Sequence, residues 1–169
     1  MLYWELTRAC DLACRHCRAE AIARRDPREL STRGGLALLD SQAGFGDPLP
    51  HLVFTGGDPL KRAELFDFVA HARRFGFAVS VTPAGTPLLT EQMVRRFGRA
   101  GVRMMALSLD GSGPERHDSL RGVPGSFART VQAARWAREA NLPLQINTLV
   151  CAETLDDLPA TLATLTGLG

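Results

Sequence analysis

The sequence predicts an α/β protein, built as a partial (βα) barrel of the TIM type with about five parallel strands and outer helices. Two observations lead to this prediction. Short β-rich apolar runs alternate with longer amphipathic runs along the chain, a pattern typical of parallel strands joined by helices. The chain has 169 residues, whereas a closed eight-stranded βα barrel needs about 200 or more. The barrel is therefore expected to lack its final strand or strands.

The predicted strands are runs rich in β-branched and aromatic residues. They cover residues 2–7, 51–55, 77–82, 102–110 and 143–150. The last run is expected to be an unpaired edge of the sheet. Because a bare, apolar parallel edge is an aggregation hazard, we expect a longer protein to be the natural context of this chain.

Helical patterns fill the segments between the strands. They cover residues 17–43, 62–75, 90–100 and 127–140, and a further helix begins near Leu155. The first pattern is expected to break at Asp26, because the proline that follows disfavours helical backbone there. Thr90 is a candidate N-cap, and Gly76 and Gly101 follow basic stretches where helices should stop.

The stretch STRGG at residues 31–35 predicts a weak start to one helix. Ser31 or Thr32 can cap it, but the acidic residue of a capping box is missing. A glycine inside a helix costs about 1 kcal/mol relative to alanine. Gly34 and Gly35 should therefore let this turn fray.

Composition indicates one globular domain over residues 1–169 and excludes several classes of protein. Apolar residues make up 45% of the chain and charged residues 22%, and the net charge is +2. So small a charge gives no reason to expect binding to nucleic acid or to a membrane surface. The sequence has no apolar run of eighteen residues, and MLYWELTRAC lacks the apolar core of a signal peptide. We expect a cytoplasmic protein.

Three cysteines are crowded into the octapeptide CDLACRHC, at Cys10, Cys14 and Cys17. Crowded thiols without a secretion signal suggest a reducing compartment and a metal or catalytic use. They directly follow the first predicted strand, and loops at the carboxyl ends of parallel strands build active sites. No triad-like arrangement of acid, base and nucleophile is found, so no catalytic side chain is assigned.

The number of thiols narrows the choice of metal. Structural zinc takes four ligands, generally as two separated pairs, and His16 or Cys151 could complete such a set only at an unusual spacing. A [4Fe–4S] cluster normally takes four thiolates. With three, one iron keeps an open position where a substrate or cofactor can bind.

Polar and glycine residues follow later strands at the same expected edge. Gly56, Gly57, Asp58 and Pro59 come directly after the second strand. They could form an ordinary tight turn, or their backbone could approach a ligand closely. The fourth strand ends with Ser108 and Asp110, which face the same side of an alternating strand and could point into a barrel or simply bond to backbone. The fifth strand carries Asn147.

Together these residues resemble the radical S-adenosylmethionine (SAM) superfamily. Its CxxxCxΦC signature is matched by the three cysteines, with His16 in the usually aromatic Φ place. Its GGEP-like turn is matched by residues 56–59, with Asp58 in place of the commoner glutamate. The stretches WELTRACDLACRHCRAEA, RGVPGSF and NTLV look most similar to members that carry a C-terminal SPASM domain. Such members modify ribosomal peptides or porphyrin-type haem precursors, and no SPASM domain is present in this chain.

The resemblance implies roles for particular residues. Cys10, Cys14 and Cys17 would hold a [4Fe–4S] cluster whose open iron chelates SAM. The turn at residues 56–59 would receive the amino group of SAM. Side chains on later strands would contact its carboxylate and ribose. The residues concerned are Ser108 and Asn147, less strongly Asp110, and Arg121, which could anchor a carboxylate or merely brace its loop.

The resemblance also implies an activity. The reduced cluster would cleave SAM to methionine and a 5′-deoxyadenosyl radical, which abstracts hydrogen from an unknown peptide or small-molecule substrate. A reducing electron donor of the flavodoxin or ferredoxin kind would be the partner. The alternative is a truncated, catalytically incompetent fragment of such an enzyme that binds a cluster or zinc without turnover.

Overall fold

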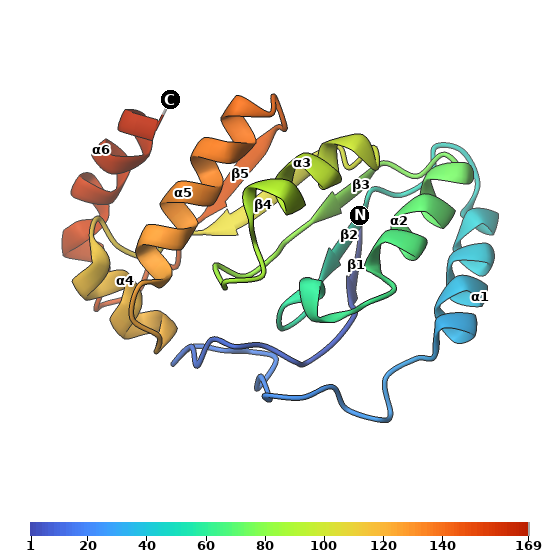
Figure 1. The fold of residues 1–169 in the computed structure, drawn as a ribbon, viewed down its shortest axis with the longest axis horizontal. Coiled ribbons are helices and arrows are strands. Elements are labelled where there is room, and N and C mark those ends of the chain that lie inside the picture. Colours follow the sequence, from blue (N-terminus) through green and yellow to red (C-terminus); the bar gives the residue numbers. More distant parts are fainter. Residues whose placement is uncertain (169) are drawn as a thin grey trace.

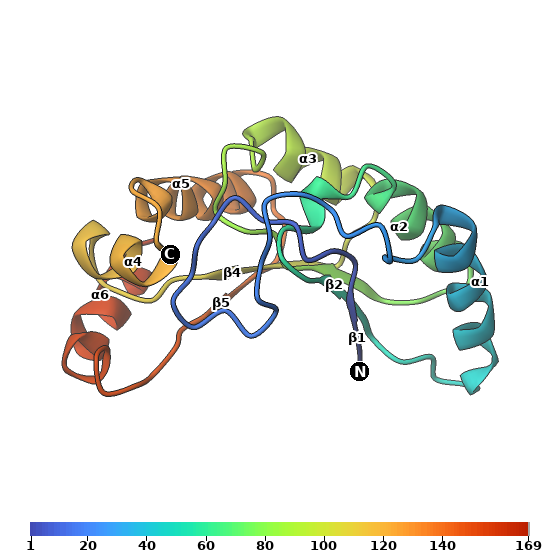
Figure 2. The same cartoon turned by 90° about the horizontal axis from the view of Figure 1, so that it is seen from below.

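One parallel sheet organises the chain in a computed structural model, which describes residues 1–168. The strand order β1-β2-β3-β4-β5 follows the sequence, and each neighbouring pair is parallel. Figure 2 shows the sheet curved beneath an arc of helices, with α2, α3 and α5 above it. The predicted partial (βα) barrel is therefore confirmed.

Each strand lies within its predicted run. The strands are β1 Leu2–Glu5, β2 Leu52–Thr55, β3 Val79–Val81, β4 Met104–Ser108 and β5 Leu144–Asn147. Within the described residues β5 is one edge of the sheet and β1 the other. The edge position expected for the fifth strand is thus confirmed.

Most helices also match their predicted segments. They are α1 Thr32–Gln42, α2 Leu65–Arg74, α3 Glu91–Arg99, α4 Pro114–Arg121, α5 Ser126–Glu139 and α6 Leu158–Leu168. Short 3₁₀ turns lie at Ala43–Phe45, Pro59–Lys61 and Leu155–Asp157. None of the helices within residues 1–168 combines the length and apolar character needed to cross a membrane.

The helix predicted over residues 17–43 is wrong in its first half. Only α1 forms, and the stretch before it is irregular backbone near the carboxyl ends of the strands (Figure 1). Backbone hydrogen bonds join Cys10 N–H to the Ile22 carbonyl and Ile22 N–H to the Arg8 carbonyl, at 2.9 and 3.0 Å. These long-range bonds satisfy the backbone that a helix would have used internally.

Helix α4 was missed because its pattern is mostly polar. Only His117 and Leu120 are buried along it, so it shows almost no apolar stripe. Its boundaries do carry sequence signals. Pro114 occupies the first turn, and Gly122 ends the helix in the left-handed conformation, with φ 69°.

The apolar core lies between the sheet and its helices. Phe54 of β2, Phe68 of α2 and Phe97 of α3 are fully buried there. Gly35 of α1 packs against the same core: a Cβ at this position would lie 2.7 Å from Phe68 Cε1. The helix penalty of this glycine is therefore offset by close packing. Ser31 caps α1, as expected, by accepting a hydrogen bond from Gly34 N–H at 3.1 Å.

Candidate functional site

The cysteine segment starts where β1 ends and runs beside the turn that follows β2. Gly57 N–H donates to the Thr7 carbonyl at 2.7 Å. A Cβ at Gly56 would lie 2.3 Å from the Thr7 oxygen, and one at Gly57 would lie 2.5 Å from the Ala9 oxygen. Gly56 also has φ 132°. The two glycines are thus required by the close approach of the chain's own backbone, in addition to any ligand that the turn binds.

Three of the four cysteines line one cavity of about 250 Å³. Cys10 is buried, and Cys14 and Cys17 are half-buried. The cavity wall also includes Glu5, His16, Arg18, Gly56, Gly57, Ala84 and Arg121. All four cysteines are free thiols, and Cys151 is not among the residues of this wall.

Each of the three thiols has a hydrogen-bond donor close to its sulfur. Leu12 N–H donates to Cys10 Sγ and Ala21 N–H to Cys17 Sγ, both at 3.4 Å. Arg121 Nη1 lies 3.7 Å from Cys14 Sγ. Burial is the main cause that raises the pKa of Cys10 to about 11. The metal-free protein therefore keeps this thiol protonated at neutral pH, and binding a metal there would release a proton.

A buried carboxylate lies behind Arg121. Asp110 is 1% exposed; its Oδ1 accepts from Leu149 N–H at 2.9 Å, and its Oδ2 lies 2.5 Å from Arg121 Nη2. The ion pair lacks hydrogen-bond alignment. Asp110 Oδ2, Arg121 Nε and His16 Nδ1 are buried without a hydrogen-bond partner in the described part of the chain. This wall of the cavity therefore retains unused hydrogen-bonding capacity.

Two histidines next to this ion pair are held neutral. Burial and the Arg121 charge lower the pKa of His16. The same causes, burial first, lower the pKa of His117 to about 4. His117 Nδ1 accepts a hydrogen bond from Asp110 N–H at 3.1 Å, which requires that nitrogen to be unprotonated.

The residues present fit an iron–sulfur cluster with an added ligand. Three thiols share one cavity, and thiolates suit such clusters. No group of three His, Cys, Asp or Glu side chains among residues 1–168 is arranged to hold a single metal ion. His16 and Arg121 belong to the same wall, and the Arg121 guanidinium there can donate to a polar ligand.

Asp58 and Pro59 lie behind the glycine turn and are not among the cavity's lining residues. Asp58 is fully buried, and its Oδ2 accepts from Thr86 Oγ1 at 2.7 Å while its Oδ1 accepts from Leu60 N–H at 3.0 Å. Burial raises the pKa of Asp58. Pro59 begins the 3₁₀ turn that Asp58 caps. The Asp58 side chain thus ties the turn to the loop after β3.

Ser108 and Asn147 lie side by side at the ends of β4 and β5, where the strand register pairs them. Asn147 Oδ1 accepts from Gln145 Nε2 at 2.7 Å. Neither residue belongs to the wall that holds the three thiols. The structure therefore brings the cysteines, His16, the two glycines and Arg121 together, with Asp110 behind them, and leaves this pair outside that wall.

Sequence reasoning missed Glu5, Arg18 and Ala84 in the cavity wall. Glu5 ends β1 and forms an ion pair with Arg18. Its place at the carboxyl end of the first strand was a signal available in the sequence. Ala84 carries no such signal, because a small apolar residue after a strand is ordinary.

Comparisons with known proteins point to one superfamily. The chain is 42% identical over 159 residues to an AdoMet-dependent heme synthase of Oleidesulfovibrio alaskensis, covering 94% of this chain and 39% of that protein. It is 30% identical over 165 residues to a PqqA peptide cyclase of Granulibacter bethesdensis, covering 98% and 43%. The chain thus spans about two fifths of the length of these curated relatives.

Solved structures share the fold. The crystal structure of Streptococcus suis SuiB bound to S-adenosylmethionine matches with a TM-score of 0.82 at 16% identity, covering 99% of this chain and 38% of that one. The family model described as "Radical SAM superfamily" matches residues 4–165. The chain therefore belongs to the radical SAM superfamily of enzymes.

Proposed function

We propose that this chain binds a [4Fe–4S] cluster through Cys10, Cys14 and Cys17 and binds SAM beside it. The observation that carries the proposal is that these three thiols line one cavity together with the glycine turn and Arg121. When bound, the two groups together supply one-electron reduction of SAM to methionine and a 5′-deoxyadenosyl radical, which abstracts hydrogen from the substrate.

The chain's own residues would bind and orient these groups. The backbone of Gly56 and Gly57 is open to the cavity and can accept hydrogen bonds from an amino group. The Arg121 guanidinium lines the cavity and can donate to a carboxylate. Ser108 and Asn147, one strand apart at the sheet's carboxyl edge, would contact the ribose or carboxylate of a ligand that extends across the sheet.

Anaerobic reconstitution tests the proposal. The chain is incubated with iron and sulfide, and bound iron is counted. Dithionite and SAM are then added, and 5′-deoxyadenosine is measured by chromatography. We expect about four irons per chain and production of 5′-deoxyadenosine. Cys10→Ala, Cys14→Ala and Cys17→Ala should each abolish both, whereas Cys151→Ala should retain both. Iron uptake without 5′-deoxyadenosine would favour the catalytically incompetent alternative, and stoichiometric zinc in its place would overturn the cluster.

The proposed substrate class of the protein to which this sequence belongs is a haem-type tetrapyrrole. The support is the higher identity to the heme synthase, 42%, than to the peptide cyclase, 30%. Absorbance titration of the reconstituted chain with Fe-coproporphyrin III, and separately with a PqqA peptide, distinguishes the two classes. Saturable binding of the peptide alone would overturn the tetrapyrrole assignment. A flavodoxin- or ferredoxin-like protein is the proposed electron donor.

A further inference from the structure

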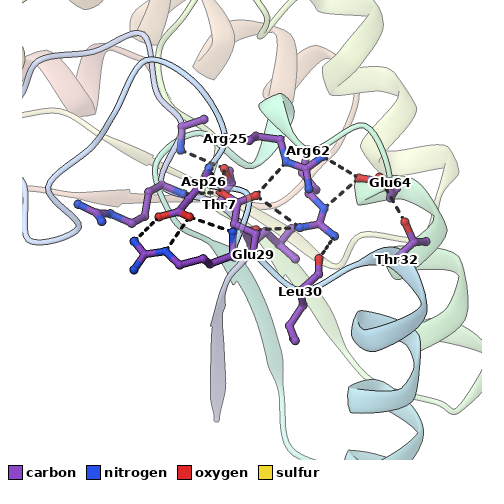
Figure 3. Close-up of polar contacts among 12 residues, drawn as sticks. Thr7, Arg25, Asp26, Glu29, Leu30, Thr32, Arg62 and Glu64 are labelled. Atoms are coloured by element: carbon purple, nitrogen blue, oxygen red, sulfur yellow. Dashed lines mark hydrogen bonds and ion pairs between the residues drawn. The ribbon is translucent and has the colours of Figure 1, made fainter.

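A buried arginine connects both ends of the cysteine loop, residues 8–30, to the sheet. Arg62, which follows β2 and is 2% exposed, lies at the centre of the contacts drawn in Figure 3. Its Nη1 donates to the Leu6 carbonyl at 3.3 Å, directly after β1, and its Nη2 donates to the Leu30 carbonyl at 2.6 Å, directly before α1. One guanidinium therefore joins the points where the loop leaves the sheet and where it rejoins regular structure.

Glu29 makes the matching contacts from within the loop. Its Oε1 accepts from Thr7 Oγ1 at 2.6 Å and from Arg8 N–H at 3.2 Å. Its Oε2 accepts from Arg25 Nε at 2.8 Å and lies 3.6 Å from Arg62 Nη1. The carboxylate thus joins the residues immediately before Cys10 to the last residues of the loop.

The second carboxylate of the group holds the arginine itself. Glu64 Oε2 accepts from Arg62 Nε at 2.9 Å, and its Oε1 accepts from Thr32 Oγ1 at 3.2 Å. The Arg62 guanidinium also lies 5.2 Å from the centre of the Phe68 ring. We refer to Glu29, Arg62 and Glu64 as the Arg62 network. Its donors and acceptors are used by the chain, so it offers little to a ligand.

The tip of the loop is held at a second place. Ala13 N–H donates to the Arg121 carbonyl at 3.0 Å, and Arg15 N–H donates to the Leu120 carbonyl at 2.9 Å. Along the chain Cys14 lies within this contact with the end of α4, and Cys10 and Cys17 lie between the contact and residues bonded to Glu29. Because residues 8–30 form no helix or strand, long-range contacts order the thiols. They include those above, the bridge at Ile22 and the hydrogen bond from Asp58 N–H to the Ala9 carbonyl at 2.7 Å.

We propose that Glu29, held by Arg62, is a positioning residue that orders the cysteine loop before any cluster binds. The effect of this order on cluster retention rests on the proposed function. Removing the Glu29 charge should leave the fold of the sheet intact but let the loop open locally. Local opening exposes the buried Cys10 thiol and should weaken retention of the cluster.

Alkylation of the metal-free protein tests the proposal without any cluster. Each thiol is labelled with iodoacetamide and quantified by peptide mass spectrometry, with Cys151 as the internal reference. In Glu29→Gln the labelling of Cys10 should rise by about tenfold or more, because a charged hydrogen-bonded acceptor is lost. Labelling of Cys151 should change by less than about twofold.

Asp157→Asn is the matched control. Asp157 likewise accepts from a hydroxyl and a backbone N–H, both of Ser112 at 2.7 Å, but its partners lie outside the cysteine loop. This variant should leave the labelling of Cys10 unchanged. Should Glu29→Gln fail to fold, Thr7→Val keeps the carboxylate and removes the hydroxyl that donates to it and that also accepts from Ala9 N–H at 3.0 Å. It should raise the labelling of Cys10 by about threefold to fivefold.

A second readout uses the reconstituted protein. Glu29→Gln should release iron to a chelator about tenfold faster than the wild type and should shift the electron paramagnetic resonance signal of the reduced cluster. Unchanged labelling of Cys10, or an equal rise at Cys151, would overturn the positioning role. A wild-type chain that takes up no iron would instead overturn the proposed function, while the alkylation result would still decide how the loop is ordered.

Discussion

Two arginine–carboxylate groups flank the cysteine loop, and they differ in how completely their hydrogen bonds are used. Arg62 is surrounded by Glu29, Glu64 and two backbone carbonyls, each contact joining elements of the fold. Arg121 faces Asp110 at 2.5 Å, yet its Nε and the Asp110 Oδ2 have no hydrogen-bond partner among the described residues. Arg62 and Asp110 are both buried, but only the Arg121 group faces the cavity.

The difference indicates separate duties for residues of the same chemical types. A buried polar group without a partner costs about 1–3 kcal/mol, so a group that stays incomplete is a candidate for binding a ligand. A group whose partners all come from the chain instead fixes the positions of the segments that it joins. We therefore infer that the Arg62 network supports the cysteine loop and that the Arg121 group forms the ligand-facing side of the site.

The largest expected effect is the loss of stability when Arg62 is replaced. Arg62→Met should lower the free energy of unfolding by about 3–5 kcal/mol, because it leaves two part-buried carboxylates and two backbone carbonyls without their cation. Urea denaturation of the metal-free chain at pH 7 measures it. Arg95→Met, which removes an exposed pair with Glu91, should cost less than about 1 kcal/mol and serves as the control. Equal losses in the two variants would contradict the supporting role of Arg62.

The two sides should also respond to pH in different ranges. The pKa of His117 falls from 6.5 to about 4 on folding, mainly through burial. Between these values only the unfolded chain binds the proton, so stability falls with falling pH across this window, by up to about 3 kcal/mol. His117→Gln should flatten that part of the profile in urea denaturation from pH 7 to 4. A wild-type profile that stays level there would contradict the burial of a neutral histidine beside Asp110.

For Glu29, on the opposite side of the loop, stability also falls as the pH falls, but the cause of the lowered pKa differs and the pH window is lower. Burial alone would raise the pKa of Glu29, but hydrogen bonds from Thr7, Arg25 and Arg8 N–H lower it below 4.5. Its contribution is complete above 4.5 and is lost only as the pH falls through the lowered value. Glu29→Gln should therefore change the profile mainly below pH 4.5, and a change confined to higher pH would argue against the bonded carboxylate.

A smaller effect concerns ligand binding at the Arg121 side. Arg121→Lys keeps the charge but loses the fork of donors, and Arg and Lys are not interchangeable at such sites. We expect an affinity for SAM that is lower by about tenfold in the reconstituted protein. Isothermal titration measures the affinity. Arg138→Lys, on the exposed side of α5, is the matched control and should bind SAM as the wild type does.

The smallest effect lies where the Arg62 network meets α1. Fraying at residues 33–36 stays a prediction, and fast amide exchange there would bear it out. Ser31→Ala should accelerate exchange at Gly34 by removing its cap, a change of about 1 kcal/mol. Strong protection of the whole turn in the wild type would instead mean that close packing at Gly35 outweighs helix propensity.

Much of the site could be predicted because its signals are local. The carboxyl ends of parallel strands lie at one edge of a sheet. Three cysteines follow one strand within eight residues and two glycines follow the next strand, so both groups must lie at that edge. Asp58 shows what local signals leave open. Its role in ligand binding stays a prediction, while its side chain bonds to Thr86, 28 residues away, and that partner depends on where the loop after β3 lies.

The sequence alone predicted the alternation of strands and helices, the partial barrel and the group of three thiols. These features have local signals, which are the period of apolar residues, the glycines at helix ends and the spacing of the cysteines. Only the tertiary structure decided that residues 17–31 are not helical, that α4 is a helix, and that Arg62 supports the loop while Arg121 faces the cavity. The first and the last of these outcomes depend on hydrogen bonds between residues 12 to 107 positions apart, which the local sequence pattern does not contain.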